Sequence, residues 1–118
     1  MAGLSPDGTT LALSRGGEPE IHIYLLSLSG GSDREITVKG WPNIATEGLY
    51  WSPDGRGLYC SSQPPLGGTI LYVHLRGNCR ALWQYKTGNV WGIPSPDGRY
   101  LAMLGQPVNS NVWMLEGF

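Results

Sequence analysis

The tetrapeptide Ser-Pro-Asp-Gly occurs three times in this 118-residue chain, beginning at Ser5, Ser52 and Ser95. In such a stretch proline presets φ at roughly −65°, aspartate bonds nearby backbone groups, and glycine supplies the positive φ that closes a turn. Apolar runs flank each copy, so each copy predicts a tight turn between two strands. The nine turn residues are Pro6, Asp7, Gly8, Pro53, Asp54, Gly55, Pro96, Asp97 and Gly98.

The copies lie 47 and 43 residues apart, and the similarity continues beyond the turns. After each turn come a short apolar strand, a loop rich in glycine and proline, and a second apolar run. In the first two repeats a glycine turn and a fourth run follow. A repeat of roughly 40 to 50 residues with four short strands is typical of a β-propeller blade. No long helix is expected, because glycine and proline interrupt the helical period throughout.

The run IHIYLLSL at 21–28 is apolar on both of its alternating faces. A blade lies between two neighbours and buries both faces, whereas a half-exposed sheet alternates apolar and polar residues. The sequence therefore predicts an all-β fold of about three propeller blades, each of four antiparallel strands, equal to half of a six-bladed propeller. The expected blades span about 1–39, 46–86 and 89–118 in one domain, and the last blade lacks its outer strand.

Two motifs carry a resemblance to a known family. They are WSPDG at 51–55 and an Ile-Tyr pair at 23–24 followed by an apolar run that ends in the Gly30-Gly31 turn. This pattern resembles the TolB-like family of β-propeller repeats, and the resemblance covers almost the whole chain. The first and third repeats have Leu4 and Pro94 in place of the motif tryptophan, which removes one packing anchor from each of those blades.

The closing stretch 95–118 is similar to the C-terminal end of such propellers in larger multidomain bacterial proteins. The resemblance implies a bacterial, non-catalytic β-propeller module for protein–protein interaction or ligand sensing. An alternative is the substrate-gating propeller of a prolyl-oligopeptidase-like peptidase, whose catalytic domain would lie outside this chain.

Charge and hydropathy exclude two classes of partner. The net charge is −1 and 14% of the residues are charged, so no basic patch is available for nucleic acid. No apolar stretch approaches the roughly 20 residues of a membrane helix, so no membrane insertion is expected. No signal peptide is visible. The sequence does not assign a compartment: the chain fits the cytoplasm as it stands, and the periplasm if it belongs to an exported parent protein.

Residues that catalyse reactions or bind metals do not cluster in the sequence. The two histidines, His22 and His74, belong to the third strands of successive repeats and are not at ligand spacing. There is no Gly-x-Ser-x-Gly elbow for a nucleophile, and each turn aspartate stands alone, whereas calcium needs clustered oxygen ligands. We therefore expect no catalytic residue, no metal site, no cofactor and no enzymatic activity.

The cysteines are expected to be free thiols. Cys60 belongs to a second strand and Cys79 to the turn before a fourth strand, so the third strand separates them. Two strand spacings are about 9.6 Å, whereas a disulfide needs Cα atoms within about 7 Å.

Tryptophans divide into two groups. Trp51, Trp83 and Trp113 fall within predicted strands and are expected in the core. Trp41 and Trp91 fall in the predicted loops between blades, on the propeller face that also carries the loops between second and third strands. An exposed tryptophan on such a loop is a plausible binding hot spot, and the alternative is that each packs over a blade junction. The candidate binding face comprises Arg15, Trp41, Gln63, Trp91 and Gln106.

Counting predicted strands gives eleven, just under three blades, whereas propellers close with roughly four to eight. An open arc would expose an apolar sheet face at each end. The chain is therefore either part of a longer propeller, a reading that the missing fourth strand slightly favours, or half of a ring closed by a homodimer. Another protein is a further possible partner. The candidate dimer contacts between end blades are Leu11, Leu13, Ile23, Leu101, Met103 and Trp113.

Overall fold

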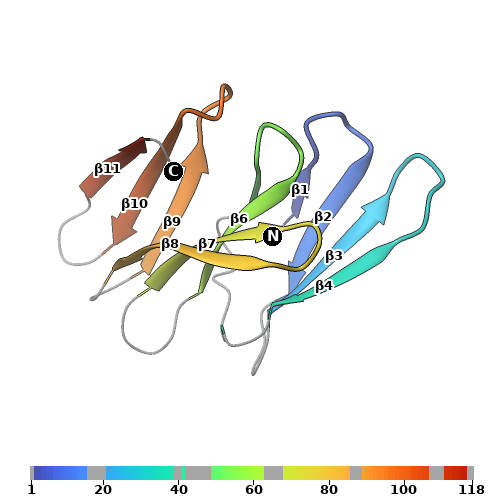
Figure 1. The fold of residues 1–118 in the computed structure, drawn as a ribbon, viewed down its shortest axis with the longest axis horizontal. Coiled ribbons are helices and arrows are strands. Elements are labelled where there is room, and N and C mark those ends of the chain that lie inside the picture. Colours follow the sequence, from blue (N-terminus) through green and yellow to red (C-terminus); the bar gives the residue numbers. More distant parts are fainter. Residues whose placement is uncertain are drawn as a thin grey trace.

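The computed structural model describes residues 2–15, 21–38, 41, 49–62, 68–85, 89–106 and 111–116. Within these residues the chain forms eleven strands and no helix (Figure 1). The strands are β1 (Ala2–Leu4), β2 (Thr10–Arg15), β3 (Ile21–Ser27), β4 (Arg34–Val38), β5 (Tyr50–Trp51), β6 (Gly57–Ser62), β7 (Gly68–His74), β8 (Cys79–Tyr85), β9 (Asn89–Pro94), β10 (Tyr100–Gln106) and β11 (Asn111–Glu116).

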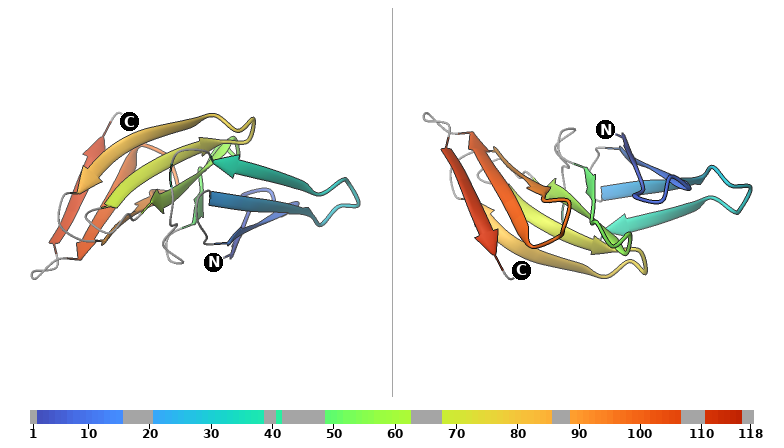
Figure 2. Two further views of the ribbon diagram at one scale, coloured as in Figure 1. Left: turned by 90° about the horizontal axis from the view of Figure 1, so that it is seen from below. Right: turned by 90° about the horizontal axis from the view of Figure 1, so that it is seen from above.

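The strands form three antiparallel sheets, each built from neighbours in the sequence. The first sheet has the order β1-β2-β3-β4, the second β5-β6-β7-β8, and the third β9-β10-β11. The second sheet lies between the other two, and the three fan out along the molecule (Figure 1, Figure 2). This arrangement confirms the prediction of an all-β fold made of antiparallel propeller blades.

Each Ser-Pro-Asp-Gly copy joins the first two strands of its sheet. The glycine amide donates to the serine carbonyl oxygen at 2.9, 2.9 and 3.0 Å in the three copies. The glycines at positions 8, 55 and 98 have φ of 77°, 72° and 73°, a conformation that other residues rarely adopt. The three turns thus have the same geometry and start the second strand of each sheet at equivalent positions.

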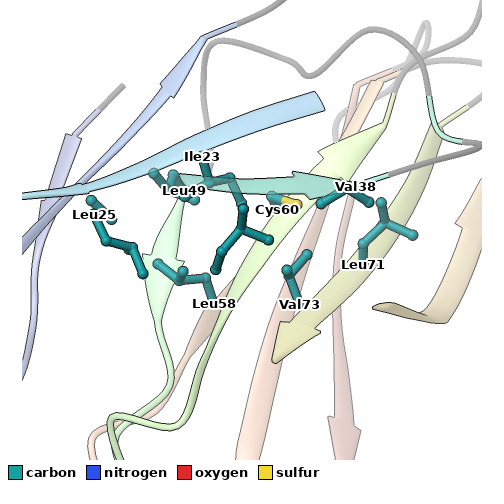
Figure 3. Packing of buried hydrophobic residues seen from close by; sticks show 10 residues of the cluster. Ile23, Leu25, Val38, Leu49, Leu58, Cys60, Leu71 and Val73 are labelled. Atoms are coloured by element: carbon teal, nitrogen blue, oxygen red, sulfur yellow. The ribbon is translucent and has the colours of Figure 1, made fainter. Parts of the chain in front are cut away.

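Side chains alternate between the faces of each strand, and one face of the first sheet packs on the second sheet. Ile23, Leu25 and Val38 of the first sheet lie against Leu58 and Leu71 of the second (Figure 3). A second cluster joins the opposite face of the second sheet to the third sheet. It comprises Tyr59, Ile70, Leu101 and Met103.

These clusters correct part of the predicted dimer interface. Ile23, Leu101 and Met103 were expected on the end faces, but all three are buried between sheets of the same chain. The physical reason is the two-residue period of a strand, because Leu101 and Met103 lie on the face of β10 that meets the second sheet. Ile23 pairs with Ser14 and shares the inward face of the first sheet with Ala12. The side chain of Trp113 lies outside the described part of the structure.

Both cysteines are free, as predicted. Cys60 pairs with Leu71 and Cys79 pairs with Val73, so β7 runs between them. Cys60 is buried in the first cluster, and burial raises the pKa of its thiol far above the usual value.

Candidate functional site beside the Ser-Pro-Asp-Gly turns

The three turn aspartates are held by the same hydrogen bonds. In each turn Oδ1 accepts the serine hydroxyl, at 2.7 Å for Asp7, 2.5 Å for Asp54 and 2.7 Å for Asp97. The same oxygen accepts the backbone amide two residues further on, at 3.0, 2.9 and 3.0 Å. These bonds, the serine hydroxyl above all, lower the pKa of each aspartate below 3.8. All three carboxyl groups are therefore ionised at neutral pH.

A pocket of about 340 Å³ lies where the turns of the second and third sheets face each other. Its lining includes Asp54 and Asp97 from the turns and Tyr59, Tyr72 and Arg80 from the second sheet. The two tyrosine rings are tilted by 51° with centroids 5.2 Å apart. The guanidinium carbon of Arg80 lies 5.8 Å from the centroid of the Tyr72 ring, within cation–π range.

The hydroxyl group of Tyr59 stays protonated in this pocket. Burial is the main cause that raises its pKa to about 12, and the neighbouring Tyr72 and Asp54 add to the effect. Tyr59 is therefore a neutral hydrogen-bonding group at physiological pH, beside ionised carboxylates and a guanidinium.

Two further pockets lie at the end of the sheets that carries the Ser-Pro-Asp-Gly turns. One of about 420 Å³ lies between the first and second sheets and includes Asp7, Trp51 and Asp54. The other, of about 400 Å³, is lined by the ends of the first strands of all three sheets. Its lining residues are Leu4, Pro6, Tyr50, Trp51, Pro53, Pro94, Ser95 and Pro96.

The predicted binding face stays a prediction, because Trp41 is the one member of the five whose side chain the structure describes. Trp41 is partly buried and packs against the cluster between the first two sheets, which fits the alternative that it covers a blade junction. Trp91 was expected in a loop, and this is wrong, because it lies within β9 and pairs with Leu104. The strand begins at Asn89, so Trp91 is its third residue and lies inside the sheet.

The other candidates lie at strand ends or beyond the described residues. Arg15 is the last residue of β2 and Gln106 the last of β10, and their side chains are not described. Gln63 lies outside the described residues. The pocket residues Tyr59, Tyr72 and Arg80 were not predicted as a site, because each was part of an ordinary strand pattern.

The described residues contain no group of three histidine, cysteine, aspartate or glutamate residues that could hold a metal ion. None of their elements is a helix long and apolar enough to span a bilayer.

Comparison with solved structures gives clear matches. The putative TolB from Agrobacterium tumefaciens superposes with a TM-score of 0.76 and 20% sequence identity, over 98% of this chain and 44% of that one. TolB from Acinetobacter baumannii superposes with a TM-score of 0.73 and 20% identity, over 98% of this chain and 29% of that one. The chain has the fold of TolB β-propeller blades. It spans less than half the length of either TolB chain.

The expected TolB-like fold is thus confirmed, and identity of 20% shows the fold alone. No protein-family model matches the chain, and no curated protein matches it.

The expectation of no enzymatic activity is overturned by a third neighbour. The periplasmic gluconolactonase PpgL of Pseudomonas aeruginosa superposes with a TM-score of 0.57 and 20% identity, over 88% of this chain and 35% of that one. An enzyme is therefore built from similar blades. The lack of a serine elbow or metal motif in the sequence was too narrow a basis for excluding catalysis, because those motifs belong to other folds.

Proposed function

We propose that this chain is a β-propeller interaction module that closes a ring with a second copy of itself. The observation that carries the proposal is the outward face of the first sheet, which is apolar and which no described sheet covers. Leu4 on that face is 56% exposed. Contiguous exposed apolar surface of this kind usually marks a protein interface.

The repeat itself indicates what should cover this face. Leu11, Leu58 and Leu101 each lie six residues after the serine of their turn. Leu58 and Leu101 are fully buried against the preceding sheet, whereas Leu11 is only partly buried. Burial differs in the same way at the position eight residues after the serine, since Cys60 and Met103 are buried and Leu13 is partly exposed. Within the described part of the chain, no sheet therefore covers this face of the first sheet, whereas the equivalent faces of the other two sheets are covered.

Strand pairing extends the apolar face across three strands. Leu11 lies opposite both Leu4 and Leu26, and Leu13 lies opposite Tyr24. Such cross-strand neighbours stabilise a sheet face through contact with each other and with whatever covers them. The far edge of the face is polar, because His22 Nδ1 lies 2.7 Å from Glu35 Oε1 on the outer strands. An apolar centre with a polar edge is typical of a protein interface.

The outward face of the third sheet has the complementary character. Ala12 lies seven residues after its serine and packs in one cluster with Leu58 of the following sheet. Its equivalent in the third sheet, Ala102, is only partly buried. Ile93, which pairs with Ala102, is 36% exposed. The third sheet thus offers the kind of face that covers a leucine such as Leu11. In a two-fold dimer the first sheet of each copy would meet the third sheet of the other, which gives a ring of six sheets.

Light scattering coupled to size exclusion tests this proposal. We expect a mass of twice the 12.8 kDa chain. Leu11→Glu should weaken the dimer by about tenfold or more, because it places a charge in the apolar centre. Asn78→Glu, which adds the same charge to an exposed turn of the second sheet, should leave the mass unchanged. A folded wild-type monomer at micromolar concentration would contradict ring closure and would leave the face to the rest of a longer propeller.

A further inference from the structure

The pocket between the second and third sheets is lined by residues that depart from the pattern of the first sheet. Tyr59 and Tyr72 lie 47 residues after Ala12 and Leu25, which hold the equivalent cross-strand pair in the first sheet. Ala12 and Leu25 are both buried and fill their junction with aliphatic side chains. The ring of Tyr59 also packs in the core of its own junction, but the hydroxyl groups of the two tyrosines add polar atoms that the first junction does without.

A third departure from the repeat accompanies the tyrosines. Gly57 stands where the other two sheets have Thr10 and Tyr100, each the fifth residue after its serine. A Cβ atom at position 57 would lie 2.5 Å from the hydroxyl oxygen of Tyr72 and 2.7 Å from the carbonyl oxygen of Val73. The glycine thus leaves room for the polar end of Tyr72 at the side of the pocket.

The charges of the pocket do not neutralise each other. In the first sheet Arg34 pairs with Leu25, and its guanidinium donates across the junction to the carbonyl oxygen of Leu75. Arg80 holds the same register beside Tyr72, but it lies over the tyrosine ring instead. Among the described residues Arg80 forms no ion pair with either pocket carboxylate. The pocket therefore presents a positive group and two negative groups that remain separate.

We propose that this pocket binds a small zwitterion of the α-amino acid type. The ammonium group would meet the carboxylates of Asp54 and Asp97, and the carboxylate group would meet Arg80. The ligand's side chain would lie against Tyr72, the more exposed of the two tyrosines. Charge-assisted hydrogen bonds and aromatic contacts are the means by which small polar ligands are oriented in pockets. A volume of about 340 Å³ holds a ligand of this size with an apolar side chain.

Isothermal titration with three matched compounds tests the ligand class. L-Phenylalanine carries both charges, phenethylamine lacks the carboxylate, and 3-phenylpropionate lacks the ammonium group. We expect L-phenylalanine to bind at millimolar concentration or better and both analogues to bind at least about tenfold more weakly, since each loses a charged hydrogen bond. Equal binding of phenethylamine would overturn the zwitterion assignment in favour of a cation site. Absence of L-phenylalanine binding to folded protein would overturn it altogether.

Two substitutions locate the site. Arg80→Gln should reduce the affinity for L-phenylalanine about tenfold or more and leave phenethylamine unaffected. Arg76→Gln removes a guanidinium from the neighbouring exposed turn, outside the pocket, and should change neither affinity. Equal effects of the two substitutions would contradict the site. Because the pocket lies within one chain, its test is independent of ring closure.

Discussion

The indole Nε1 of Trp51 donates a hydrogen bond of 2.9 Å to the carbonyl oxygen of Gly3, across the boundary between the second and first sheets. The two residues lie on β5 and β1, the first strands of their sheets. Trp51 also packs against the apolar cluster of that junction. The tryptophan of the WSPDG motif is therefore a link between sheets. Leu4 and Pro94, which replace it in the other repeats, cannot form such a bond.

Trp51→Phe should destabilise the protein by about 1 kcal/mol or more, because it removes the hydrogen bond to Gly3 and part of the packing while retaining an aromatic ring. Urea denaturation followed by circular dichroism measures the loss. An unchanged midpoint would mean that water replaces the bond without cost.

Gly57→Ala should destabilise the protein by about 1 to 3 kcal/mol, because the new methyl group would overlap Tyr72 and the backbone of β7. Gly3→Ala is a matched control in another strand, since a Cβ atom there meets its nearest neighbours at an ordinary 3.4 Å. We expect the control to unfold close to the wild-type midpoint. Equal effects of the two substitutions would show that the contact with Tyr72 is easily relieved.

Acid should weaken the fold through the three turn aspartates. The folded pKa of each lies below the unfolded value near 3.8, so the unfolded chain binds more protons in this range. The stability that these groups contribute is present above that value and is lost as the pH falls through the folded pKa. Denaturation midpoints measured at neutral pH and near pH 3 should show the loss. Asp54→Asn should make the loss of stability at low pH smaller. A loss as large as that of the wild type would contradict the role given to this aspartate.

The thiols should differ in reactivity. Thiolate is the reactive form, and Cys60 is buried with a raised pKa, so it should react with a thiol reagent only after unfolding. Cys79 is partly exposed and should react first. Unfolded, unreduced protein should contain two thiols, and a count of zero would contradict the described strand order.

The turns and strands were predictable because local chemistry determines them. Pro6, Asp7 and Gly8 specify a turn without reference to the rest of the chain, and two further copies set the repeat. Sheet faces were harder to predict. Ile23 was assigned outward because its pairing with Ser14 depends on strand register, and a shift of one residue reverses every side chain.

The pocket was not predictable from strand patterns. Tyr59 and Tyr72 satisfy the same apolar periodicity as Ala12 and Leu25, so they differ only when equivalent positions of the repeats are aligned. Trp91 was placed in the loop between the second and third blades, yet tryptophan favours strands and β9 pairs with β10 throughout. The pairing of strands determines where the two tyrosines and Trp91 lie, and the residues next to them in the sequence do not indicate that pairing.

Cysteine cross-linking tests ring closure between the first sheet of one copy and the third sheet of another. Leu11→Cys and Ala102→Cys are introduced separately, each with Cys79→Ser, and the two proteins are oxidised alone and after mixing. Because Ala12 and Leu58 share a cluster at the equivalent junction, we expect a disulfide-linked species of twice the chain mass in the mixture alone. No cross-link in the mixture, or equal cross-linking of Leu11→Cys by itself, would contradict it.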